Sequence, residues 1–168
     1  MRTKSLHHSQ KIDEATNYIR QRITSKPRVA IILGTGLGKL ATHITPETTL
    51  PYGEIPHLPQ STALSHQGQL VVGTLEGIPI IAMQGRFHLY EGYPVSDAVL
   101  PVCVMQKLGA EILIVSNASG GVNPKFKGGD IMVMNSHINL MFHKQPELVN
   151  SSLIPESAEQ PGTLIYDQ

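Results

Sequence analysis

Two short apolar runs, each followed directly by a loop of small residues, are the feature that most constrains the fold of this chain. The first run covers residues 28–33 and leads into the glycine-rich segment 34–38, and the second covers 112–115 and leads into 116–121. A strand that ends in a glycine loop is typical of parallel α/β sheets, in which ligand-binding loops follow the carboxyl ends of the strands. The pattern therefore predicts an α/β fold with two buried parallel strands, whose loops share one sheet edge and can share one ligand.

Two amphipathic helices accompany these strands. Residues 10–23 carry an apolar stripe at three-to-four spacing and end before Pro27, and a second helix opens at Pro94 and ends at Gly109. The stripe of the second helix consists of Ala98, Val102, Met105 and Leu108. Pro101 lacks the N–H group that a helix interior uses, so we expect it to kink or divide this helix.

Further apolar runs predict an antiparallel addition to the sheet. Residues 70–75 and 78–83 are separated by Glu76-Gly77, a dipeptide of the length that closes a tight hairpin. Residues 131–134 predict one more strand, whereas 51–68 are punctuated by proline and glycine and are expected to form loop. Together these elements predict a three-layer α/β/α fold with a central mixed sheet.

Composition limits the classes of function. The chain has 13 basic and 13 acidic residues and a formal net charge of zero, so neither nucleic acid nor an acidic membrane is expected as a partner. No apolar leader and no membrane-spanning run is apparent, which predicts a cytoplasmic protein that acts on small molecules. The single cysteine, Cys103, cannot form an intrachain disulfide and is expected to be a buried, inert thiol.

Other common site chemistries find little support. The 8 histidines include no pair at the i, i+4 spacing of a helical zinc site, and we predict no bound metal. No Gly-x-Ser-x-Gly elbow is present, which argues against acyl transfer. The segment 34–38 is neither a Walker A loop nor a dinucleotide fingerprint, although its glycines and the Thr35 hydroxyl suit a single phosphate.

The segment 84–94 carries the clearest site chemistry. Arg86, His88 and Tyr90 alternate just after a predicted strand, so an extended backbone would point them to one side. The Arg86 guanidinium offers a fixed fork of donors to phosphate or carboxylate. The alternative is that these are a solvated surface arginine and a loop histidine bonded to a backbone carbonyl. Their combination at a strand end favours a ligand site.

The segment Gln84-Gly85-Arg86-Phe87-His88-Leu89-Tyr90-Glu91-Gly92-Tyr93-Pro94 resembles the signature loop of the trimeric, low-molecular-mass purine nucleoside phosphorylases. Four further segments resemble that family in order and spacing: 32–38, 52–56, 116–124 and 129–140. The resemblance runs from about Pro27 to Leu140, whereas 141–168 diverge into a loop-rich tail. It therefore implies a phosphorylase α/β domain over 1–140, corresponding to the N-terminal portion of the family fold.

The resemblance also implies a reaction and a set of site residues. In this family inorganic phosphate attacks C1′ of a purine (2′-deoxy)ribonucleoside and releases the base and a pentose 1-phosphate, a reaction of purine salvage that needs no cofactor. By similarity, the expected phosphate-binding residues are Thr35, His66, Arg86, His88 and Ala118, with His88 also catalytic. The residues expected on the ribose and base side are Tyr90, Asn117 and Gly120. A homotrimer is the expected assembly of the complete fold.

Departures from the family pattern leave alternatives open. Thr35 is a serine in most relatives, and threonine here is also characteristic of methylthioadenosine phosphorylases, so a phosphorylase of that type is one alternative. The family's base-recognising glutamate and asparagine lie beyond the matched region. We therefore expect the 168-residue chain to be inactive by itself and to expose an apolar face and an unpaired strand edge. An inert phosphate-binding or assembly fragment is the second alternative.

Overall fold

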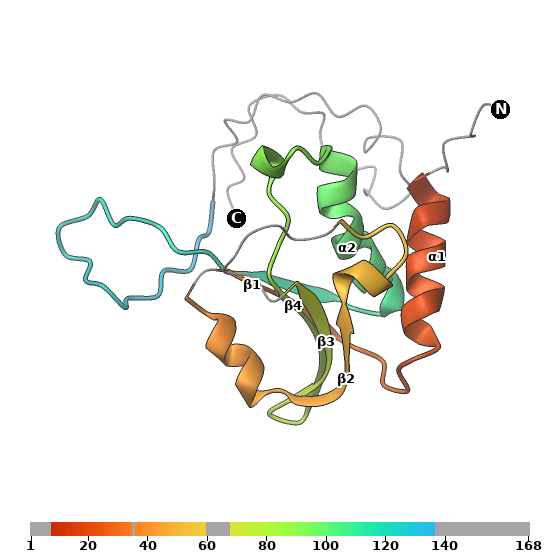
Figure 1. Cartoon of the computed structure of the whole chain (residues 1–168). Coiled ribbons are helices and arrows are strands. Elements are labelled where there is room, and N and C mark those ends of the chain that lie inside the picture. Colours follow the sequence, from red (N-terminus) through yellow and green to blue (C-terminus); the bar gives the residue numbers. More distant parts are fainter. Residues whose placement is uncertain (1–7, 35, 60–67, 137–168) are drawn as a thin grey trace. The chain divides into compact units, whose positions relative to one another are not determined.

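The structure is a computed structural model that describes residues 8–34, 36–59 and 68–136. Its contacts divide the chain after Ala118, and the two units are treated separately. The described residues of the first unit form a sheet with helices packed on it (Figure 1). Thr35, His66 and the predicted domain boundary at 140 lie outside the described residues.

The regular elements follow one another as α1 (His8–Arg20), β1 (Val29–Leu33), η1 (Gly38–His43), β2 (Thr45–Pro51), η2 (Tyr52–Glu54), β3 (Gln69–Leu75), β4 (Ile78–Gln84), η3 (Leu89–Glu91), α2 (Val95–Leu108) and β5 (Ile112–Val115). The strands lie in the order β2-β3-β4-β1-β5. β1 pairs in parallel with both β4 and β5, whereas β2, β3 and β4 pair antiparallel. The predicted mixed sheet and its parallel β1–β5 pair are confirmed.

The predicted hairpin is also confirmed. β3 and β4 pair from Gln69–Gln84 to Leu75–Ile78, and the connecting residues Glu76 and Gly77 both have positive φ, 49° and 77°. Left-handed backbone at both positions is the geometry of a type I′ turn, which matches the twist of the strands it joins.

β2 was not predicted from the sequence, because its seven residues include two prolines and four of them are charged or hydroxyl side chains. It occupies the outer edge beside β3, where a strand tolerates proline because only one side pairs. η2 likewise lies in a segment that was expected to contain only loop.

The sheet is covered on two faces. Alternate side chains of β1 point to opposite faces: Ile31 and Leu33 pack in a core cluster with Leu40 and Ala41 of η1. The other face of the sheet meets α2, which packs on β1 and on α1. Polar bonds also join the two helices, including Lys11 Nζ to Asp97 Oδ1 at 3.2 Å. The three-layer arrangement is therefore present in the first unit.

Both helices differ in detail from their sequence patterns. α1 ends at Arg20 and not at Ile23. Ile12, Ala15 and Ile19, which belong to the apolar stripe predicted over residues 10–23, are buried. α2 continues through Pro101 without a break, and Pro101 is itself buried. The face that α2 buries consists of Leu100, Pro101, Val104, Met105 and Leu108, so the predicted stripe was wrong at Ala98 and Val102. The apolar spacing of α2 therefore did not identify which of its faces is buried.

Three predictions of burial or pairing were wrong. The β5 side chains are 43 to 57% exposed, because β5 is the last described strand of the sheet. Residues 131–134 form no strand and are 61 to 90% exposed, since none of the described strands pairs with them. Cys103 is half-buried, which still raises the pKa of its thiol.

Within the described ranges, no helix is long and apolar enough to cross a membrane.

Candidate anion site at the strand ends

Three neighbouring parallel strands, β4, β1 and β5, end at one edge of the sheet, and Ser116 ties two of these ends together. Its Oγ accepts a hydrogen bond from the Gly34 N–H at 2.9 Å and donates to the Ile32 carbonyl at 3.1 Å. The Ser116 N–H also donates to the Ile32 carbonyl, at 3.1 Å. The loop after β5 is thus fixed against the loop after β1, as the repeated strand-and-loop pattern predicted.

Gly34 makes this close approach possible. A Cβ atom at position 34 would overlap the Ser116 carbonyl and would lie 2.9 Å from the Cα atom of Asn117. Only a residue without a side chain fits this position while the two loops remain in contact. The first glycine of the segment 34–38 therefore has a packing role, which the sequence did not distinguish from anion binding.

Arg86 reaches the same place from the end of β4. Its Nη1 donates to the Ser116 carbonyl across 3.4 Å, a long hydrogen bond. Its Nε is buried and has no hydrogen-bond partner within the described part of the chain. A buried donor on a permanently charged group is costly to leave unpaired, and an anion at this edge would satisfy it.

Tyr52 supports the loop that carries Arg86. Its side chain is 1% exposed, and its hydroxyl donates to the carbonyl of Gly85 at 2.7 Å. Its ring also contacts that of Phe87, with the centroids 5.0 Å apart. Burial raises the pKa of Tyr52, so the hydroxyl remains a donor at neutral pH. Tyr52 opens one of the segments that resemble the family, but its residue type alone does not indicate this hydrogen bond.

His88 and Tyr90 form a second pair within the signature loop. Their rings stack with centroids 4.7 Å apart and an interplanar angle of 15°. The backbone here is not continuously extended, because residues 89–91 form the turn η3. The Glu91 carboxylate holds that turn by accepting the His88 N–H at 2.9 Å. Tyr90 is 79% exposed, so one face of this pair is open to solvent.

The remaining predicted residues are placed only in part. Asn117 and Ala118 directly follow Ser116 at the strand-end edge, and both are exposed. Gly120 belongs to the second unit, and Thr35 and His66 lie outside the described residues. The structure thus brings Arg86 to the 116–118 loop and brings His88 to Tyr90.

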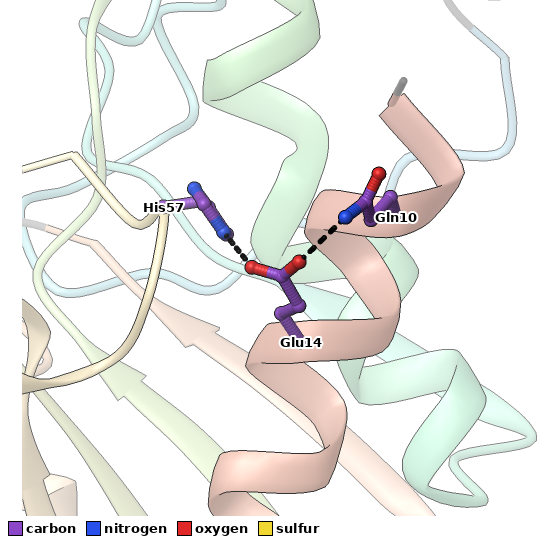
Figure 2. A network of polar contacts seen from close by, with 3 residues as sticks. All are labelled: Gln10, Glu14 and His57. Carbon is purple, nitrogen blue, oxygen red and sulfur yellow. Dashed lines mark hydrogen bonds and ion pairs between the residues drawn. The ribbon is translucent and has the colours of Figure 1, made fainter. Parts of the chain in front are cut away.

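A polar network near η2 was also missed by the sequence reasoning. In Figure 2, Glu14 lies between Gln10 and His57, and its two carboxylate oxygens accept hydrogen bonds from them at 2.9 and 2.6 Å. The His57 hydrogen bond is the main reason that the pKa of Glu14 is lowered. His57 has a φ of 66°, unusual for a residue other than glycine. The network joins α1 to the segment that follows Tyr52.

The described residues contain no candidate metal site, and the cavity beside α2 lies apart from the strand ends. Among residues 8–34, 36–59 and 68–136, no three His, Cys, Asp or Glu side chains lie close enough to hold a metal ion. A cavity of about 220 Å³ is lined by parts of β1, α2 and β5, including Ala30, Val102 and Leu113. Its lining does not include Arg86 or Ser116, so it is separate from the candidate anion site.

Comparisons with known proteins define the class of protein. Residues 28–164 match the phosphorylase superfamily, which is most of the chain. The solved structures that it resembles include isoform 2 of purine nucleoside phosphorylase from Schistosoma mansoni, in complex with cytosine and ribose-1-phosphate, at 41% identity and a TM-score of 0.68. That likeness covers 76% of this chain and 45% of the solved chain.

Curated relatives narrow the class further. The chain is 51% identical to purine nucleoside phosphorylase 1 of Bacillus subtilis over 78% of its own length and 48% of the relative's. It is 49% identical to the purine nucleoside phosphorylase of Rattus norvegicus, of which it covers 43%. The chain belongs to the purine nucleoside phosphorylase family of the phosphorylase superfamily and spans about half the length of these relatives. This favours the main prediction over the methylthioadenosine alternative.

Proposed function

We propose that this chain binds inorganic phosphate at the edge where β1, β4 and β5 end. Arg86 would supply the charge, and Thr35, His88 and the Ala118 N–H would add hydrogen bonds; a role for His66 at the phosphate entrance is proposed from the family resemblance alone. In the complete phosphorylase fold, this half of the site serves the reversible phosphorolysis of purine (2′-deoxy)ribonucleosides.

One observation supports the phosphate proposal above the others. The Arg86 guanidinium is held beside the 116–118 loop by a single long bond, and its buried Nε has no partner among the described residues. A dianion there would accept two parallel N–H bonds from the guanidinium, which is the preferred geometry of arginine with phosphate. Nothing of comparable chemistry lines the cavity beside α2.

The proposed reaction is the one that the resemblance to the family implies. A phosphate oxygen forms a bond to C1′ while the bond from C1′ to the purine nitrogen breaks, and its electron pair leaves with the base. The ribosyl group carries positive charge in the transition state, so the phosphate is both the nucleophile and the stabilising anion. His88 donates a hydrogen bond to the phosphate, and its stacked neighbour Tyr90 contacts the sugar from the same turn. Asn117 and Gly120 are proposed for the ribose and base side.

The proposed substrates follow from the relatives. The similar Schistosoma mansoni structure named above contains ribose-1-phosphate, and another similar structure, of a Schistosoma purine nucleoside phosphorylase, is in complex with hypoxanthine. We propose the same classes of ligand for the complete site of this family member, with phosphate as co-substrate and no cofactor. A homotrimer and a cytoplasmic location are proposed for the complete enzyme on the same basis.

Titration calorimetry with inorganic phosphate tests the anion site. Arg86→Ala should remove binding, because a hydrogen bond to a charged group is worth about 1.5 to 3 kcal/mol and arginine can form two. Thr35→Ala should weaken binding only about fivefold, as expected for about 1 kcal/mol. Arg28→Ala is the matched control, since Arg28 is an exposed arginine that pairs with Glu111 at 3.6 Å. Equal affinities for wild type and Arg86→Ala would refute the assignment.

Turnover is a separate question from phosphate binding. No described residue matches the base-recognising glutamate and asparagine of the family, and each missing donor to developing charge costs about 2.7 to 4 kcal/mol. We therefore expect no measurable hypoxanthine release from inosine and phosphate by the 168-residue chain alone, in a coupled xanthine oxidase assay. Turnover within tenfold of a chain extended by a relative's C-terminal half would contradict this.

A further inference from the structure

Tyr52 holds the residues on both sides of Arg86. Its hydroxyl donates to the carbonyl of Gly85 at 2.7 Å, and its ring packs on that of Phe87 with the centroids 5.0 Å apart. Both aromatic side chains are buried. Because one side chain contacts the residue before Arg86 and the residue after it, the backbone that carries the guanidinium cannot move independently of Tyr52.

The backbone of Tyr52 is also connected to the end of β4. Its N–H donates to the carbonyl of Gly68 at 2.8 Å, and the N–H of Gly68 donates to the carbonyl of Gln84 at 3.1 Å. Gln84 is the last residue of β4 and directly precedes Gly85. Tyr52 therefore contacts the Arg86 loop through its side chain and the strand end through its main chain.

The segment 52–58 forms a stiff connection that leads away from this loop. The N–H of Ile55 donates to the carbonyl of Tyr52 at 3.1 Å, and the N–H of Leu58 donates to the carbonyl of Ile55 at 3.3 Å. The side chains of all three residues are buried. Coupling between separated groups is carried by packed side chains and hydrogen bonds of this kind. A displacement at one end of the segment is therefore transmitted to the other.

His57 fastens the far end of this segment to α1. Its Nε2 donates to Glu14 Oε2 at 2.6 Å, as Figure 2 shows. The φ of His57 is 66°, so a contact must offset the strain of left-handed backbone at this residue. Burial of Ile55 and Leu58 is not directional, whereas a hydrogen bond is. The orientation of the segment is therefore set by α1.

A second carboxylate contact in the described structure makes a useful contrast. Glu47 accepts hydrogen bonds from Thr24 Oγ1 at 2.7 Å and from the Ser25 N–H at 3.3 Å. It joins the connection between α1 and β1 to β2, the strand at the far edge of the sheet from β1. This contact supports the fold without leading to the Arg86 loop, so it separates an effect on stability from an effect on the anion site.

We propose that the Glu14–His57 pair is a positioning contact for the anion site, because it fixes the segment 52–58 and, through Tyr52, the direction of the Arg86 guanidinium. Glu14 and His57 are positioning residues that act through Tyr52. The inference rests on the proposed phosphate site for its ligand, whereas the connection from α1 to the Arg86 loop can be measured without one. It makes the first helix a determinant of phosphate affinity.

Titration calorimetry with inorganic phosphate gives the first test. His57→Gly removes the imidazole and leaves a residue that accepts positive φ, and it should weaken phosphate binding about three- to tenfold. Glu76→Gly is the matched control, because Glu76 is an exposed residue with a φ of 49° at the opposite end of β4 from Arg86. It should leave the affinity unchanged. Equal affinities for wild type and a folded His57→Gly would overturn the proposal.

A double-mutant cycle tests whether the two residues act as a pair. Glu14→Ala should weaken phosphate binding as much as His57→Gly does, and the double variant should be no weaker than either. Glu14→Gln keeps an acceptor oxygen and should restore most of the affinity. Glu47→Ala should lower the urea midpoint without changing the affinity. Additive losses in the cycle, or an equal loss of affinity in Glu47→Ala, would contradict a positioning role.

Hydrogen exchange without phosphate separates this inference from the phosphate site itself. The backbone amides of residues 85–88 should exchange faster in His57→Gly than in wild type, and Glu76→Gly should match wild type. If wild type binds no phosphate, the proposed phosphate site fails and this comparison alone decides the positioning contact. Unchanged exchange at residues 85–88 would overturn it. Glu14→Ala supplies the same comparison if His57→Gly does not fold, since alanine favours the helix α1.

Discussion

Replacing Gly34 by alanine tests the close approach that assembles the candidate anion site. The added Cβ would overlap the backbone carbonyl of Ser116, and backbone cannot rotate away as a flexible side chain can. Overpacking of this kind costs about 1 to 3 kcal/mol. If the loops separate, the bond from the Gly34 N–H to Ser116 Oγ is lost as well, at about 1 kcal/mol. We therefore expect a loss of about 2 to 4 kcal/mol in the free energy of unfolding.

Urea unfolding followed by circular dichroism measures this loss. With a denaturant dependence near 2 kcal/mol per molar urea, the midpoint should fall by roughly 1 to 2 M. Gly38→Ala is the matched control, because a Cβ at position 38 meets nothing within 4 Å and φ there is not positive. It should leave the midpoint unchanged or raise it slightly. Equal midpoints for Gly34→Ala and wild type would refute the packing argument, and phosphate affinity should fall only for Gly34→Ala.

Three further perturbations test the supports of the site. Tyr52→Phe should lower the free energy of unfolding by about 1 to 3 kcal/mol, because it leaves the buried carbonyl of Gly85 unpaired. The control is Tyr18→Phe, because the Tyr18 hydroxyl makes no hydrogen bond in the described structure. In the same urea assay this variant should change the free energy of unfolding little. The hydrogen bond from His57 lowers the pKa of Glu14 below its usual 4.5, so the folded state favours the carboxylate and gains stability above that pH. That gain should disappear as the pH falls through the folded value, and melting curves of wild type and Glu14→Gln should converge in acid; a constant difference would contradict the linkage. Cys103 should react with iodoacetamide more slowly than an unfolded cysteine, because burial raises the pKa of its thiol, and mass spectrometry with and without urea measures the ratio.

The elements that the sequence predicted well are those decided by local pattern. The hairpin follows from two apolar runs on either side of Glu76-Gly77, and the parallel β1–β5 pair follows from repeated strand-and-loop units. β2 was missed because its pairing is decided by β3 and not by its own composition. The exposure of β5 was missed for the opposite reason, since its composition indicates a covered strand and only the sheet order shows an uncovered edge.

The candidate site shows the same division. Arg86, His88 and Tyr90 were singled out by residue type and spacing, and the structure places Arg86 against the 116–118 loop. The residues that hold that arrangement are Tyr52 and Ser116. Both lie in segments that resemble the family, but neither residue type nor spacing indicates their roles. Their roles depend on contacts between segments more than 30 residues apart, which a single sequence does not reveal.

The strand order has a consequence for how this chain folds. β2, β3 and β4 are neighbours in sequence as well as in the sheet. They are joined by residues 52–68 and by Glu76-Gly77, so their pairing closes shorter stretches of chain than the pairing of β1 does. β1 is made before all of them, yet both of its partners, β4 and β5, follow much later. Contacts between distant segments form slowly, because the entropy of closing the intervening chain is lost before the contact is gained. We therefore expect the β2–β4 meander to form first. Until β4 has been synthesised, β1 remains an unpaired apolar segment, and chaperones can bind it during that interval.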